Sequence, residues 1–202
     1  AQDVTGRIAL LEGELIAPGG HVHAQLQLNA PLHAIHGDRV VLRDQSAQRT
    51  LGGGRVLDPF APPRNRHRQA RLAQLRALAG ETLEDILPQL LPSAVNGLEP
   101  EHLERQFNRP RQTWQLPDSA VEITTRQGAR LFELSYWEYL AQSLIPALHR
   151  FHEEQPDELG PDRDRLRRYA LPQLERPVFI ALLEQALATG SVHASGPWLH
   201  LP

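Results

Sequence analysis

The sequence predicts a multidomain chain, in which a small antiparallel β domain is followed by two α+β units. Three observations predict this arrangement. Polar and apolar residues alternate near the start of the chain, which is typical of strands. A proline-rich segment then interrupts the pattern, and apolar residues recur at helical spacing after it. Finally, an order of three helices and one β-hairpin can be traced twice in the remaining residues.

The β domain is placed at residues 1–58. Residues 21–28 alternate polar and apolar side chains at every position, which is the period of a half-buried strand. Further strands are expected over residues 4–10, 39–43 and 49–57, with turns at residues 17–20 and 36–38. Short strands at this spacing favour a small barrel or sandwich.

A linker is placed at residues 59–65, because prolines cannot continue a strand ladder or a helix. The first α+β unit is then residues 66–134. Its expected elements are helices from about 72 to 79, 83 to 90 and 99 to 107, a shorter helix at 111–116, and a hairpin of residues 121–125 and 129–134. Gln127-Gly128 provides the turn of that hairpin.

The second α+β unit is placed at residues 135–202. Its expected elements are helices over about 136–155, 162–170 and 177–189, and a hairpin of residues 191–194 and 197–201. Gly190 suits the end of the third helix, because glycine is favoured just beyond a helix C-terminus. Three helices followed by a hairpin is the order of a winged-helix domain, so two such domains are predicted.

Composition excludes several classes of function. The chain has no Cys, which excludes disulfides, thiolate metal sites and cysteine nucleophiles. It also has no Lys, and its net charge of −3 argues against a uniformly basic nucleic-acid binder but allows local arginine patches. No apolar run is long enough for a membrane span and no signal peptide is evident, so a cytoplasmic location without membrane contact is expected. The absence of Met, even at position 1, suggests a fragment or a processed chain.

Neither catalysis nor metal binding is expected. Gly52, Gly53 and Gly54 lack the lysine that a phosphate-binding loop requires, so we interpret them as strand glycines that permit close approach. His21 and His23 share one strand face, but the chain has no Cys to complete a metal site, and ordinary surface histidines explain the pattern. No nucleophile and base combination is supported by the local sequence.

Segments near the start and near the end of the chain resemble a known family. Asp3-Val4-Thr5-Gly6, the Gly37-Asp38 turn and the closing segment at residues 49–56 resemble, in this order, the third domain of elongation factor Tu and its relatives. Residues 42–57 have the form seen in the selenocysteine-specific elongation factors, the SelB family. Residues 160–168 and 196–202 also resemble bacterial SelB, which continues beyond its barrel into a row of winged helices.

The resemblance implies a function in translation. SelB proteins carry selenocysteinyl-tRNA to the ribosome and recognise an mRNA hairpin that recodes a UGA stop codon. By this resemblance the barrel contacts tRNA, and the mRNA hairpin is held mainly by terminal winged helices that are not among these residues. GTP and Mg²⁺ belong to a GTPase domain that is also absent here, so no cofactor and no enzymatic activity are expected for this chain, which should be a monomer.

Arginines supply the candidate RNA contacts, because a guanidinium group offers a planar set of donors that fits phosphate. The predicted tRNA contacts are Thr5, Arg43 and Arg49, and the predicted RNA-phosphate contacts are Arg64, Arg66, Arg68, Arg163 and Arg167. The alternative is that these charges are paired on solvated surfaces. Asp38 and Asp44 are the possible partners in the barrel, and Glu158 and Asp162 are those near Arg163 and Arg167. Asp164 and Arg168 are four residues apart on the same predicted helix and can pair.

The alternative function is a winged-helix regulator that binds DNA. Such a protein needs a basic third helix that reads the major groove. The expected third helix at residues 177–189 carries no Arg or Lys, and its polar side chains include Glu184 and Gln185. The sequence therefore favours the translation factor.

Overall fold

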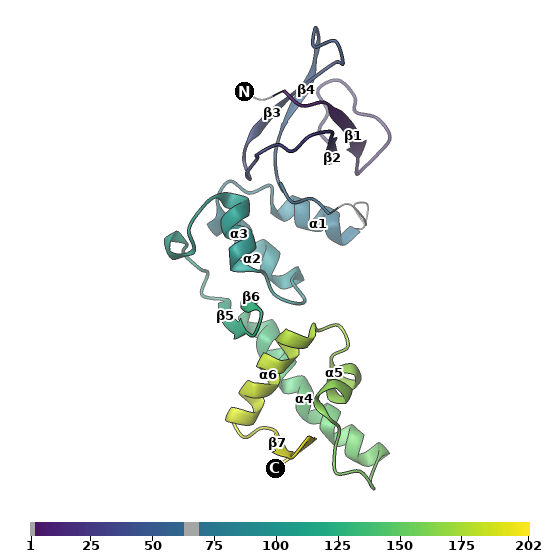
Figure 1. Ribbon diagram of the computed structural model, residues 1–202, viewed down its shortest axis with the longest axis vertical. Helices are drawn as coiled ribbons and strands as arrows, with labels where there is room; N and C mark the ends of the chain where they lie inside the picture. Colours follow the sequence, from purple (N-terminus) through teal and green to yellow (C-terminus); the bar gives the residue numbers. More distant parts are fainter. Residues whose placement is uncertain (1–2, 63–68) are drawn as a thin grey trace. The chain divides into compact units, whose positions relative to one another are not determined.

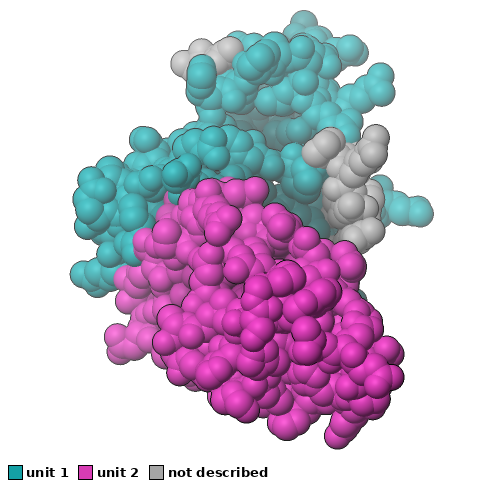
Figure 2. All heavy atoms as spheres, turned by 60° about the horizontal axis from the view of Figure 1, so that its bottom comes forward, with its two compact units in different colours: residues 1–90, 101–115 teal, residues 91–100, 116–202 magenta. Residues whose placement is uncertain are grey.

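The structure is a computed structural model that describes residues 3–62 and 69–202 (Figure 1). It divides into two compact units, shown in different colours in Figure 2. Unit 1 comprises residues 1–90 and 101–115, and unit 2 comprises residues 91–100 and 116–202. These units reflect the density of contacts and do not test the predicted domain boundaries after residues 58, 65 and 134, which stay predictions. None of the helices in the described residues is long and apolar enough to cross a membrane.

Unit 1 begins with four short strands in two antiparallel pairs. β1 (Gly6–Leu10) pairs with β2 (Ala24–Leu28), and β3 (Arg39–Arg43) pairs with β4 (Thr50–Arg55). The strand at residues 39–43 has the predicted bounds, whereas the other three are shorter than predicted. Gly53 supports its interpretation as a strand glycine, because a Cβ there would lie 3.0 Å from the carbonyl oxygen of Val40 on the paired strand.

The helices of unit 1 follow the predicted apolar spacing. They are α1 (Gln69–Ala77), α2 (Leu83–Leu90) and α3 (Pro100–Phe107). Thr82 caps α2, since its hydroxyl accepts from the Asp85 amide at 3.2 Å while the Asp85 carboxylate accepts from the Thr82 amide at 3.3 Å. Buried leucine, isoleucine and tryptophan side chains make up the core, namely Leu75, Leu78, Leu83, Ile86, Leu87, Leu103 and Trp114.

The prediction of a helix at residues 111–116 is wrong. Only a 3₁₀ turn, Arg111–Thr113, forms there. Trp114 leaves the turn with extended dihedral angles, φ −88° and ψ 144°, and its indole nitrogen donates to the Arg109 carbonyl at 3.1 Å. Burying this large side chain and satisfying its N–H outweighs the weak propensity of a segment bounded by prolines at both ends.

Polar side chains join the strands and helices within unit 1. The His36 ring donates a hydrogen bond from Nε2 to the Leu78 carbonyl, 2.7 Å away, and packs against the Phe107 ring with the ring centres 4.4 Å apart. Gln106 is buried and donates to the Leu57 carbonyl at 3.1 Å. His36 and Gln106 thus connect the strands of unit 1 to its helices.

Acidification should weaken unit 1 through Glu84. Arg109 grips this carboxylate with two hydrogen bonds of 2.9 and 3.0 Å, and these bonds lower the pKa of Glu84 from 4.5 to about 2. A lowered folded-state pKa gives stability that is present above pH 4.5 and is lost as the pH falls towards 2. Because both side chains are about one-third exposed, we expect the loss to be about 1 to 2 kcal/mol. Denaturant unfolding between pH 6 and pH 2.5 checks this, and the variant Glu84→Gln should have a flatter profile over that interval.

Unit 2 contains two β-hairpins and three α-helices. The hairpin of β5 (Ala120–Thr125) and β6 (Gly128–Glu133) leads directly into α4 (Leu134–Glu154). Then follow α5 (Arg163–Ala170), α6 (Arg176–Ala188) and the hairpin of β7 (His193–Ser195) and β8 (Trp198–His200). A single core joins α4, α5 and α6, with Leu144, Leu148, Leu166, Phe179 and Leu182 inaccessible to solvent. The order from α4 to β8 is that of a winged helix.

Two segments of unit 2 that are distant in sequence meet at the second hairpin. Gly160 is buried with φ +153°, and a Cβ there would collide with the backbone carbonyl of Leu199 in β8. The next residue, Pro161, accepts a hydrogen bond of 3.0 Å from the Leu199 amide. Asp162 then caps α5 by accepting from the Arg165 amide at 2.7 Å. The Gly160-Pro161-Asp162 segment therefore fixes both the hairpin and the start of α5.

Candidate nucleic-acid interface

Thr5 lies immediately before β1 and is exposed. Its side-chain oxygen accepts from the Asn29 amide group at 3.0 Å, and its carbonyl accepts from the Asn29 backbone N–H at 2.9 Å. Asn29 directly follows β2, so these two bonds close the end of the first strand pair. The hydroxyl of Thr5 is thus held in a defined place at the surface, where it still has a lone pair to offer to a ligand.

Arg43 and Arg49 lie at the two sides of the β3–β4 loop. Asp44 organises this loop, because its carboxylate accepts from the amides of Gln48 and Arg49 at 2.9 and 3.2 Å. These backbone hydrogen bonds, that from Arg49 first, lower the pKa of Asp44. The Asp44 amide also donates to the Arg49 carbonyl at 2.9 Å. This role of Asp44 was not predicted from the sequence, although aspartate is typical of the first position of such turns.

The alternative in which Asp38 and Asp44 neutralise these arginines finds no support in the described residues. The Asp44 carboxylate is used by the loop amides, and the Asp38 carboxylate accepts from the Ile35 amide at 3.0 Å. Arg43 donates only a long hydrogen bond of 3.4 Å, to the Ala47 carbonyl, and within residues 3–62 and 69–202 neither arginine forms an ion pair. Two exposed guanidinium groups on one loop are therefore available to an anionic partner.

The predicted contacts Arg64, Arg66 and Arg68 lie outside the described residues, so they stay predictions. Two neighbouring arginines of this basic stretch are bound within unit 1. Arg71 pairs with Asp58 at 2.7 Å, and Arg76 pairs with Glu12 at 2.9 Å. The stretch therefore includes arginines that serve the structure of unit 1.

Arg163 and Arg167 on α5 differ in their surroundings. Arg163 is exposed and has no ion pair in the part of the chain that the structure describes. Arg167 is partly buried and donates to the Leu174 carbonyl at 2.9 Å, which ties α5 to the segment before α6. Glu158, one of the suggested neutralising groups, pairs with Arg165 instead of either residue. The RNA-phosphate role of both arginines stays a prediction.

Asp164 pairs with Arg176 and not with Arg168, the residue four positions further along α5. Asp164 accepts from the Arg176 guanidinium at 2.9 Å, and this contact lowers the pKa of Asp164. Arg176 lies at the start of α6, so tertiary packing brings it closer to Asp164 than the helical neighbour four residues away. The weak preference for pairs at this spacing is easily overcome by such packing.

The third helix of unit 2, α6, lacks the row of basic side chains that a DNA-recognition helix presents to the major groove. Its apolar side chains Val178, Phe179, Leu182, Leu183 and Ala186 are buried in the core. Arg176 is engaged by Asp164, and the exposed Glu184 pairs with Arg126 at 3.0 Å. No group of three or more potential metal ligands gathers anywhere in residues 3–62 and 69–202.

A β domain of antiparallel strand pairs followed by helices and hairpins, with the order from α4 to β8 that of a winged helix, is thus the class of protein that this fold defines. Comparison with known proteins names the class more closely. Residues 1–63 match the β-barrel domain of the selenocysteine-specific elongation factor, and residues 145–201 match a winged helix of elongation factor SelB. Residues 1–63 are therefore a SelB-type barrel, and residues 145–201 are a SelB-type winged helix.

Three curated relatives are each called selenocysteine-specific elongation factor. Those of Escherichia coli, Haemophilus influenzae and Desulfomicrobium baculatum are 33%, 28% and 24% identical over all of this chain. The chain spans only 31%, 32% and 33% of their lengths. The crystal structure of a bacterial selenocysteine-specific elongation factor, EF-Sec, shares the fold, with a TM-score of 0.61 at 17% identity over 99% of this chain and 30% of that one. The chain is therefore similar along its whole length to a segment of these elongation factors, and the predicted fold class is confirmed.

Proposed function

We propose that this chain is the barrel and winged-helix part of a selenocysteine-specific elongation factor, which delivers selenocysteinyl-tRNA to the ribosome at a recoded UGA codon. The observation that carries the proposal is the match of the whole chain to three proteins of that name, with a SelB-type barrel near its start and a SelB-type winged helix near its end. A DNA-binding regulator is not favoured, since the single arginine of α6, Arg176 at its first position, is paired with Asp164 and the rest of the helix has no basic side chain for reading bases.

The proposed tRNA contact is the β3–β4 loop together with Thr5. Arg43 and Arg49 are exposed and unpaired within the described part of the chain, and Asp44 holds the loop between them. Phosphate contacts from a fixed loop fit recognition of a tRNA backbone, because guanidinium groups bind phosphate oxygens with two parallel donors. Thr5 would add a neutral hydrogen bond to the same ligand.

The other parts of the proposal concern the longer protein. GTP and Mg²⁺ are bound outside these residues, and the GTPase activity belongs to that region. The winged helices connect the barrel to the part of the factor that holds the mRNA hairpin. The partners are then selenocysteinyl-tRNA, the ribosome and that hairpin, and the factor works in the cytoplasm as a monomer.

Replacing Arg43 or Arg49 by Glu in the full-length factor should weaken binding of selenocysteinyl-tRNA by about 1 to 3 kcal/mol, because a charge-assisted phosphate contact is lost. The dependence of affinity on salt should also fall by about one unit per lost contact. Filter binding over a range of salt concentrations measures both quantities. Arg126→Glu is the matched control, since Arg126 is an exposed arginine outside the barrel. Unchanged affinity and salt dependence in both barrel variants would show that these arginines are only surface charges.

A further inference from the structure

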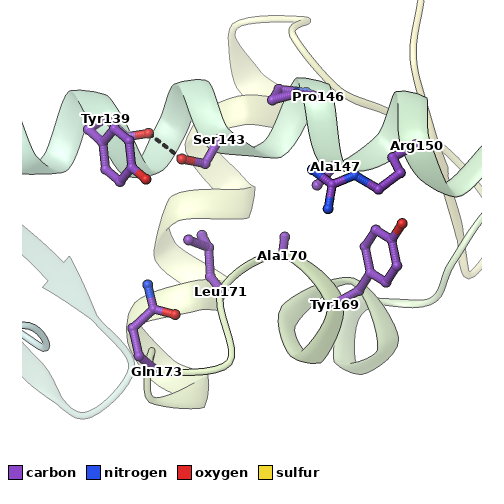
Figure 3. A pocket seen from close by; sticks show the side chains of 9 residues that line it. All are labelled: Tyr139, Ser143, Pro146, Ala147, Arg150, Tyr169, Ala170, Leu171 and Gln173. Atoms are coloured by element: carbon purple, nitrogen blue, oxygen red, sulfur yellow. Dashed lines mark hydrogen bonds between the residues drawn. The ribbon is translucent and has the colours of Figure 1, made fainter.

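Unit 2 has an open pocket between α4 and the segment that runs from the end of α5 towards α6 (Figure 3). Its volume is about 340 Å³, at the lower end of the range for small-ligand pockets. Tyr139, Ser143 and Arg150 line it from α4, and Tyr169 and Gln173 line it from the opposite side. Two aromatic rings, a hydroxyl, an amide and a guanidinium group thus surround one hollow.

Helix geometry explains why α4 presents these residues together. Tyr139, Ser143 and Arg150 are four and seven residues apart, so they lie along one face of the helix. Leu140, Leu144 and Phe151 occupy the adjoining face and are buried in the core. Packing of the core therefore fixes the rotation of α4 and directs the polar face into the pocket.

At one end of the pocket, the exposed ring of Tyr139 lies against the ring of Tyr136. Tyr139 is 62% exposed, and its ring is within 21° of parallel to that of Tyr136, with the ring centres 6.5 Å apart. Tyr136 is held by burial, which raises its pKa, and by a hydrogen bond of 3.5 Å from its hydroxyl to the Val95 carbonyl. One face of Tyr139 is thus open to a flat ligand.

The opposite end of the pocket carries positive charge. Arg150 is exposed and lies across the gap from Tyr169 (Figure 3). The Tyr169 ring packs edge-on against Phe151 at 6.0 Å, and its hydroxyl donates to Glu154 at 2.9 Å. The same hydroxyl also interacts with the Arg150 guanidinium, so it joins Glu154 to Arg150. A guanidinium group has five N–H donors, so Arg150 can bind a phosphate as well.

Polar groups suited to reading a base edge lie between the two ends. The Ser143 hydroxyl donates to the Tyr139 carbonyl at 2.7 Å, so its lone pairs remain able to accept. Gln173 belongs to a segment that Asn96 anchors, accepting from the Glu175 amide at 2.7 Å and donating to the Gln173 carbonyl at 3.3 Å. The Gln173 amide group interacts with the Tyr136 hydroxyl, and because an amide group has two N–H donors and an accepting oxygen, it can also bond a base edge.

We propose that this pocket binds one unpaired nucleotide of an RNA, with the base on Tyr139, its edge at Ser143 and Gln173, and its phosphate at Arg150. Splayed-out bases stacked on aromatic side chains, with hydrogen bonds to their edges, are the usual way in which proteins recognise single-stranded RNA. The inference rests on the proposed function only for the source of the RNA, which would be the messenger or ribosomal RNA near the bound factor.

The test uses the 202-residue chain and a fluorescein-labelled, unstructured ten-nucleotide RNA of mixed sequence, with binding followed by fluorescence anisotropy. Tyr139→Ala should weaken binding about 5- to 100-fold, whereas Tyr139→Phe should keep the affinity because the stacking face is retained. Arg150→Gln should reduce the salt dependence by about one unit. Gln142→Ala, an exposed change on α4 outside the pocket, is the control and should have no effect.

Three results with the single-stranded RNA would overturn the proposal. They are failure of the unaltered chain to bind the RNA, equal affinity of the unaltered chain and Tyr139→Ala, and an equal loss of affinity in Gln142→Ala. A duplex RNA of the same length should bind more weakly, and equal binding of the duplex would also count against a pocket for an unpaired base. None of these results bears on selenocysteine delivery, because that function is measured separately by UGA readthrough in cells.

Discussion

Gly160→Ala should destabilise unit 2 by about 3 to 4 kcal/mol, through steric overlap and an unfavourable backbone conformation. The added methyl group would overlap the Leu199 carbonyl oxygen and lie 3.0 Å from the carbonyl carbon. Both obstacles are backbone atoms of β8, which cannot move aside as a flexible side chain could. The φ of +153° at this position is also rarely adopted by residues with a side chain. Thermal unfolding followed by circular dichroism measures the effect.

The matched control is Gly196→Ala in the turn of the same hairpin. Gly196 also has a positive φ, +64°, but no atom lies within 4 Å of the position that a Cβ would take. The control should therefore cost only about 1 kcal/mol, the penalty for a left-handed conformation. If both variants lose the same stability, the close approach of Gly160 to β8 does not determine the stability of unit 2.

Asp58→Ala should lower the stability of unit 1 by about 3 to 5 kcal/mol, because it leaves a buried arginine without its counter-charge. The side chains of Asp58 and Arg71 are only 8% and 9% exposed, and their ion pair measures 2.7 Å. Asp58 also accepts from the Phe60 amide at 2.8 Å, which adds a lost hydrogen bond. Urea unfolding with an unchanged m-value checks the loss.

Two further variants separate the buried charge from general damage. Arg76→Ala removes an ion pair to Glu12 in which the arginine is 61% exposed, so it should cost less than about 1 kcal/mol. The double variant Asp58→Ala with Arg71→Met should recover part of the stability lost in the single variant, because no charge then remains buried. A double variant that is less stable than Asp58→Ala would contradict this explanation.

Local patterns predicted most elements of the fold, because those elements are set by local side chains. The helices α4, α5 and α6 appear within a few residues of their expected bounds, since the apolar face of each one is buried in the shared core. The helix expected at residues 111–116 failed because burial of Trp114, a tertiary effect, decided the conformation.

The sequence predicted which types of residue form the candidate site, but not which carboxylates pair with which arginines. Exposed arginines at the ends of a β-turn can be recognised in a sequence, and the resemblance placed Arg43 and Arg49 in the barrel. Which carboxylates would neutralise them depends on geometry, and Asp44 was already bound to loop amides. Likewise, Asp164 pairs with Arg176 and not with Arg168, because α5 and α6 meet at this point. The pocket at Tyr139 was not anticipated, since it requires α4 and the segment after α5 to face each other.

The most direct test of the central claim is UGA readthrough in the source organism after interruption of the gene that encodes this chain. The reporter carries an in-frame UGA codon followed by a recoding hairpin, and a matched reporter has a cysteine codon in its place. A selenocysteine-specific factor predicts loss of the full-length UGA product and of its radioactive selenium, unchanged product from the cysteine reporter, and recovery when the intact gene is restored. Full-length, selenium-containing product in the absence of the gene would contradict the account.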